Sequence, residues 1–103
     1  MTRETAYKSY LIMIDTVTQA KCTFELFVST STAIHGFCNK YQSTWAAIQV
    51  VRTVTDNPES TEEYIEQVVE RARHLVNEFL VYVGTKVEYS IMKDEVDVSE
   101  ARR

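Results

Sequence analysis

Two cysteines and two histidines are the side chains best suited to metal or nucleophilic chemistry: Cys22, Cys38, His35 and His74. His35 and Cys38 stand three residues apart, so a helix would place them on one face as half of a zinc site. Cys22 is expected to point away from that face, and the chain has no Cys-x-x-Cys pair. No local pattern marks a cysteine or hydroxyl as an activated nucleophile. We therefore expect two reduced cysteines, no metal, no cofactor and no catalytic residue.

A second candidate for chemistry is the acidic pattern Glu62-Glu63-x-x-Glu66. This pattern supplies magnesium ligands in all-helical nucleotide pyrophosphohydrolases, in which a Glu-x-x-Asp pair on the following helix completes the site. Magnesium needs converging carboxylates, but neither Glu78 nor Glu88 is followed by an aspartate three residues later. We interpret the glutamates as a solvated acidic helix start. A magnesium-dependent enzyme of the pyrophosphohydrolase kind is an alternative hypothesis.

The composition predicts the elements that must position these residues. The chain has 103 residues, enough for one domain with its own core. Only two glycines and one proline are present, and turns depend on such residues. Their scarcity favours a few long helices over a sheet with many turns.

Residues 3–29 are predicted to form the first helix. Its β-branched content leaves a strand at 10–17 or 23–28 as an alternative. Apolar residues recur at alternating spacings of four and three, which is the periodicity of a helix that packs along one face. The face comprises Ala6, Tyr10, Met13, Val17, Ala20, Phe24 and Phe27, widened by Leu11, Ile14 and Val28.

A second helix is predicted over residues 32–55, after a break at the hydroxyl-rich run 29–32. The spacing of four and three continues through this segment in the same phase, so a single bent helix over residues 1–55 is an alternative. Gly36 is a weak point within the second segment, because glycine disfavours helix. The predicted inward face comprises Ile34, Cys38, Tyr41, Trp45 and Ile48.

The third helix is predicted to run from about residue 59 to at least 83. Asp56-Asn57-Pro58 forms the boundary before it, and Ser60 with Glu63 offers a capping box. Beyond Gly84 either the helix continues or residues 86–98 form a short hairpin. The predicted apolar stripe comprises Ile65, Val68, Val69, Ala72, Leu75, Val76, Phe79, Leu80 and Val83.

These elements predict an all-α fold, an antiparallel three-helix bundle with long helices. A short C-terminal strand or hairpin is an alternative for the last residues. Residues 1–93 would form the single helical domain and residues 94–103 a charged, flexible tail. The apolar run after Lys8 is too short for a membrane span and ends at Asp15. We therefore expect no membrane association and a cytoplasmic protein.

Charge is unevenly distributed along the chain. Residues 1–55 hold five basic and three acidic groups, whereas residues 56–103 hold six basic and twelve acidic groups. The acidic half argues against direct binding of nucleic acid. The thirty residues from Leu26 to Thr55 carry only two full charges, Lys40 and Arg52, and the only tryptophan, Trp45. Because a helix surface normally keeps a charged face for water, we expect this segment to be covered. We predict a homodimer with residues 41–54 in the interface.

These observations favour a non-enzymatic protein-binding module, such as an adaptor, an assembly factor or an inhibitor of another macromolecule. A structural subunit of a larger assembly is a further alternative. The acidic helix would attract a partner with a basic surface. The predicted partner-binding residues are Tyr41, Trp45, Ile48, Arg52, Glu59, Glu62, Glu63, Glu66 and Glu70.

Overall fold

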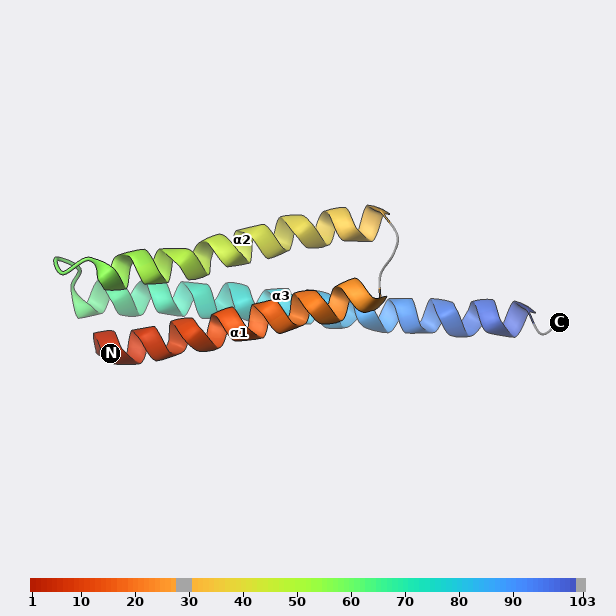
Figure 1. Ribbon diagram of the computed structural model, residues 1–103, viewed down its shortest axis with the longest axis horizontal. Coiled ribbons are helices and arrows are strands. Elements are labelled where there is room, and N and C mark those ends of the chain that lie inside the picture. Colours follow the sequence, from red (N-terminus) through yellow and green to blue (C-terminus); the bar gives the residue numbers. More distant parts are fainter. Residues whose placement is uncertain (28–30, 102–103) are drawn as a thin grey trace.

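The chain folds into three long helices that lie side by side (Figure 1). They are α1 (Arg3–Phe27), α2 (Ser31–Asp56) and α3 (Glu62–Ala101). The computed structural model describes the backbone of residues 1–27 and 31–101, and the side chains of residues 1–25 and 34–88. α2 runs antiparallel to both α1 and α3, and each helix packs against the other two. The predicted all-α three-helix bundle is confirmed. Its first two helices are separate elements, α1 and α2, and not the single bent helix of the alternative. Residues 28–30, which include the first half of the predicted break at 29–32, lie outside the described residues.

Helix α3 is longer than its neighbours and continues past the ends of α1 and α2 (Figure 1, blue). The segment after Gly84 is thus helical to Ala101, and the hairpin alternative is not found in the described backbone. The side chains of residues 89–101, and all of residues 102–103, lie outside the described part of the chain. The flexibility of the tail therefore stays a prediction.

The predicted inward faces of α1 and α3 are confirmed. Side chains at alternating spacings of four and three are buried between the helices, where burial of apolar area stabilises the fold. Leu11 on α1 and Leu80 on α3 are exceptions, with 61% and 37% of their surfaces exposed, and Phe27 and Val28 lie outside the described side chains. The buried apolar residues of α1 are Ala6, Tyr10, Met13, Val17 and Phe24, and those of α3 are Ile65, Val69, Ala72, Val76, Phe79 and Val83.

The predicted inward face of α2 is wrong by about one residue position. Ile48 is buried as expected, and Tyr41 and Trp45 pack half-buried against the core. Ile34 and Cys38, however, are exposed. The buried positions include two threonines, which polarity alone assigns to the surface. A helical threonine can be buried when its hydroxyl bonds to the preceding turn, and Thr55 Oγ1 donates to the carbonyl of Val51 at 2.7 Å. The buried residues of α2 are Phe37, Thr44, Ile48, Val51 and Thr55.

An aromatic cluster joins the three helices. Phe37 of α2 stacks on Phe24 of α1, with ring centroids 3.9 Å apart. Phe37 also packs 5.4 Å from Phe79 of α3. Tyr41 and Trp45 extend the cluster along α2, with centroids 6.0 Å apart. Phe37, which falls outside the predicted face, is thus the side chain that connects all three elements.

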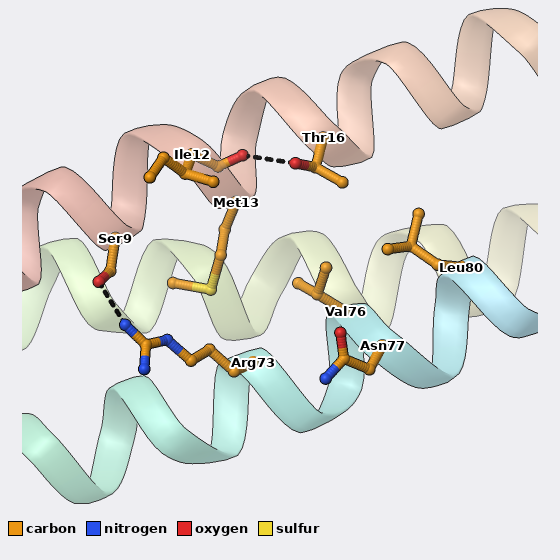
Figure 2. A pocket seen from close by; sticks show the side chains of 8 residues that line it. All are labelled: Ser9, Ile12, Met13, Thr16, Arg73, Val76, Asn77 and Leu80. Atoms are coloured by element: carbon orange, nitrogen blue, oxygen red, sulfur yellow. Dashed lines mark hydrogen bonds between the residues drawn. The ribbon is translucent and has the colours of Figure 1, made fainter.

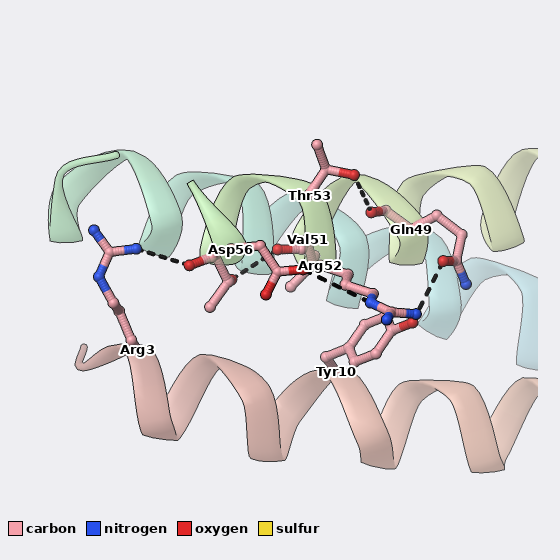
Figure 3. A network of polar contacts seen from close by, with 8 residues as sticks. Arg3, Tyr10, Gln49, Val51, Arg52, Thr53 and Asp56 are labelled. Carbon is pink, nitrogen blue, oxygen red and sulfur yellow. Dashed lines mark hydrogen bonds and ion pairs between the residues drawn. The ribbon is translucent and has the colours of Figure 1, made fainter. Parts of the chain in front are cut away.

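Arg3 ties the start of α1 to the connection between α2 and α3 (Figure 3). Its guanidinium donates to four backbone carbonyls, with Nη1 bonding to Thr55 at 2.7 Å and Asn57 at 3.0 Å. Nη2 bonds to Pro58 at 3.1 Å and Ser60 at 2.7 Å. The five donors of a guanidinium allow one side chain to satisfy several carbonyls. The Thr55 carbonyl belongs to the last turn of α2, where carbonyls lack helical partners, so Arg3 also caps this helix.

The N-terminal cap of α3 is Thr61, and the predicted capping box of Ser60 with Glu63 is wrong. Thr61 Oγ1 accepts a hydrogen bond from the backbone N–H of Tyr64 at 3.2 Å, the standard geometry of a threonine cap. The Ser60 carbonyl instead accepts from Arg3.

Replacing each of the two glycines with alanine is expected to change the free energy of unfolding differently. A Cβ at Gly84 would meet no atom within 4 Å, whereas a Cβ at Gly36 would lie 2.9 Å from Tyr82 Oη. Because alanine favours helix over glycine by about 0.8–1.0 kcal/mol, Gly84→Ala is expected to raise the free energy of unfolding by about 0.5–1 kcal/mol. For Gly36→Ala, the close contact between the new Cβ and Tyr82 Oη is expected to cancel this gain in stability. Adding Tyr82→Phe, which removes the hydroxyl, should recover it. Urea unfolding followed by circular dichroism checks both, and equal gains at the two glycines would contradict the close approach.

Candidate partner-binding surfaces

A groove lined by small and apolar side chains lies between α2 and α3. Its volume is about 650 Å³. Val50 is 48% exposed on one wall and Tyr64 is 51% exposed on the other. Such exposed apolar side chains in a concave surface are typical of binding sites. The lining residues are Ser43, Ala46, Ala47, Val50, Tyr64, Gln67, Val68, Arg71, Ala72 and Leu75.

The groove continues along the same two helices into a smaller depression of about 210 Å³, which shares Ser43 and Leu75 with it. Lys40 and Glu78 line this part. The α2 wall of the larger depression carries small or apolar, uncharged residues, whereas the α3 rim carries Arg71 and, two turns further, Glu78. Two opposite charges thus lie on the α3 rim, and Lys40 is the one charge on the α2 side of the two depressions.

The outer side of α3 presents an acidic surface beside the groove. A shallow depression of about 800 Å³ is lined by Glu63, Glu66, Gln67, Glu70, Arg71 and His74. Glu66 Oε2 lies 3.8 Å from the amino group of Met1, and His74 Nε2 lies 3.2 Å from Glu78 Oε1. Within the described side chains Glu63 and Glu70 make no ion pair, so their charges are directed to solvent.

The predicted site residues on α2 lie on the other side of that helix, toward α1. Tyr41 and Trp45 are half-buried, and Lys21 Nζ lies 5.1 Å from the centroid of the Tyr41 ring. Arg52 is exposed and pairs with Asp56, the distance from Nε to Oδ2 being 3.8 Å. Ile48 is fully buried in the core and offers no surface to a partner.

The structure brings together only part of the predicted set. Glu63, Glu66 and Glu70 share one depression, whereas Glu59 and Glu62 are exposed around the start of α3. The groove residues Ala46, Ala47 and Val50 lie within the predicted interface segment 41–54. The aromatic residues of that segment, Tyr41 and Trp45, are the ones predicted to bind a partner. The feature of the sequence that points to these groove residues is the absence of charge between Lys40 and Arg52, because part of this uncharged segment stays exposed in the fold.

A third groove, of about 260 Å³, lies between α1 and α3 (Figure 2). Its main polar contact is internal, because Arg73 Nη2 donates to Ser9 Oγ at 2.7 Å. Met13 and Val76 belong to the core, while Ile12 and Leu80 border the opening. This groove is smaller than the one between α2 and α3, and its arginine already joins two helices.

The candidate metal ligands do not converge. Across the described residues, no three side chains of His, Cys, Asp or Glu gather closely enough to hold a metal ion. Cys22 and Cys38 are free and exposed, as is His35. Where the structure is described, Glu62, Glu63 and Glu66 have no carboxylate pair on a facing helix.

Comparison with family models, with curated proteins and with solved structures finds no match to this chain. Among its described residues, no helix combines the length and hydropathy that crossing a membrane requires. Hypotheses about function therefore depend on the surfaces of the chain itself.

Proposed function

We propose that the protein is a non-enzymatic protein-binding module, an adaptor, assembly factor or inhibitor, that engages a basic partner through the outer face of α3. The observation that carries the proposal is the acidic depression around Glu63 and Glu70, whose carboxylates have no basic partner within the described side chains. Exposed charges that are not paired internally are free to steer and orient a partner of opposite sign. The adjacent apolar groove supplies area that a partner can bury.

A double charge reversal tests this proposal. Capture with the full chain from an extract of the source organism identifies a partner, and calorimetric titration then measures its affinity. Glu63→Lys with Glu70→Lys should weaken binding at least tenfold at about 0.1 M salt, and the loss should shrink as salt screens the charges. Both residues are exposed on a helix, so the fold should survive.

Glu4→Lys with Asp15→Lys is the matched control, since it makes the same change in net charge at exposed positions of α1. This control should bind like the wild type. Equal loss in both doubles would indicate a nonspecific effect of net charge. Unchanged affinity in the α3 double would contradict the proposed surface.

A further inference from the structure

The face of α2 and α3 that carries the groove is long enough for two helices of a second copy to pack along it. The two connected depressions run from Tyr64 to Phe79 on α3. At 1.5 Å per residue this is about 22 Å. Small side chains at Ser43, Ala46 and Ala47 let a second helix approach closely, as close helix packing requires.

The charges on the groove rim are complementary to their own copy. Arg71 and Glu78 are both exposed and stand seven residues, or about 10 Å, apart on α3. A two-fold axis that crosses the groove beside Leu75 sets α3 antiparallel to α3 of a second copy. Arg71 then faces Glu78 of the second copy, and Glu78 faces Arg71 of the second copy. Each isologous contact occurs twice, as two-fold symmetry demands.

The same rotation places α2 against α2 of the second copy. Lys40 lines the end of the groove on α2, but the stretch from Tyr41 to Val51 carries no charge. With the axis at the level of Ser43 and Leu75, which line both depressions, Lys40 lies opposite Ala46 of the second copy, so no like charges of the two α2 helices face each other. The glutamates of the outer α3 face, Glu63 and Glu70, stay beside the contact. A second copy thus matches both walls of the groove, the neutral one by its small side chains and the charged one by reciprocal ion pairs.

We propose that the groove-bearing face of α2 and α3 packs against the same face of a second copy of this chain and forms an antiparallel, two-fold symmetric dimer in which α2 and α3 of each copy build a four-helix contact. This inference goes beyond binding of a basic partner, because it uses a different surface. It also divides the predicted interface segment 41–54. The groove side of α2 faces the second copy, whereas Tyr41 and Trp45 remain on the side of α1.

Sedimentation velocity of the full chain from 1 to 200 µM tests the dimer. The wild type should sediment as a dimer at the upper concentrations. Ala46→Glu and Val50→Glu should each weaken association at least tenfold, because a charge would be buried in an apolar contact. Leu11→Glu, at an apolar residue that is equally open to solvent on α1, is the matched control and should leave association unchanged. A monomer throughout this range would overturn the proposal.

A charge exchange tests the orientation of the two copies. Arg71→Glu alone and Glu78→Arg alone should each weaken the dimer about fivefold or more, because like charges then face each other. The double variant Arg71→Glu with Glu78→Arg should restore wild-type association. A dimer insensitive to these changes, or a double variant no better than the singles, would overturn the antiparallel arrangement. A monomer that still binds a basic partner through Glu63 and Glu70 would leave only the proposed function standing.

Discussion

Replacing Phe37 with alanine is expected to lower the free energy of unfolding by about 3–5 kcal/mol, the usual cost of removing a buried phenylalanine. Only 2% of Phe37 is exposed. Its ring stacks on Phe24 and contacts the rings of Tyr41 and Phe79. The deletion therefore leaves a cavity between all three helices. Because domains of this kind are stable by only about 5–15 kcal/mol, the variant should be close to unfolding at 37 °C.

Urea unfolding followed by far-ultraviolet circular dichroism measures this change. Phe37→Leu, which keeps most of the apolar volume, should cost less than half as much. Leu11→Ala is the surface control and should change stability by less than about 0.5 kcal/mol. A Phe37→Ala variant as stable as Leu11→Ala would show that Phe37 is not a core residue.

Replacing Arg3 with alanine is expected to cost about 2–3 kcal/mol. A hydrogen bond to a charged group contributes about 1.5–3 kcal/mol, but two of the four bonds are exposed, so water replaces part of the loss. The bonds to the carbonyls of Thr55 and Ser60 are partly buried and should dominate. For a chain of this size, the corresponding fall in Tm is about 8–24 °C.

Arg3→Lys separates geometry from charge. A lysine keeps the positive charge but has three donors on one nitrogen, so it cannot span four carbonyls. It should recover less than half of the loss. Lys8→Ala is the control, because Lys8 is exposed and pairs only with Glu4, four residues away at 3.5 Å, in the described structure. Thermal melts of the three variants decide the point, and an Arg3→Ala melt that coincides with that of Lys8→Ala would refute the role of Arg3.

The sequence predicts α1 and α3 well because their buried residues are almost all apolar, so hydrophobic periodicity alone identifies the inward face. It fails for α2 because Thr44 and Thr55 are buried there. Threonine reads as polar in the sequence, but its hydroxyl can bond within its own helix. A face assigned from large apolar residues then moves toward Trp45 and misses Phe37.

The candidate surfaces are less predictable than the fold. The acidic face of α3 is visible in the sequence, because Glu63, Glu66 and Glu70 recur at helical spacing. The groove is not, because it depends on which sides of α2 and α3 remain uncovered once α1 has packed. Its α2 wall consists of small residues such as Ala46 and Ala47 that carry no signal of their own. The role of Arg3 likewise cannot be predicted from the sequence, because its four acceptors are backbone carbonyls more than fifty residues away.

The bonds of Arg3 also bear on how the bundle loses its structure. If α1 left the bundle, the last turn of α2 and the α2–α3 connection would lose the donor that bonds to four of their carbonyls, and the shared core would lose the covering layer that α1 provides. A helical hairpin of α2 and α3 alone would thus lose stability both from the missing hydrogen bonds and from the exposed core. The consequence is cooperativity: partial unfolding that releases the first helix destabilises the turn at the far end of the other two, and the three helices melt as one unit.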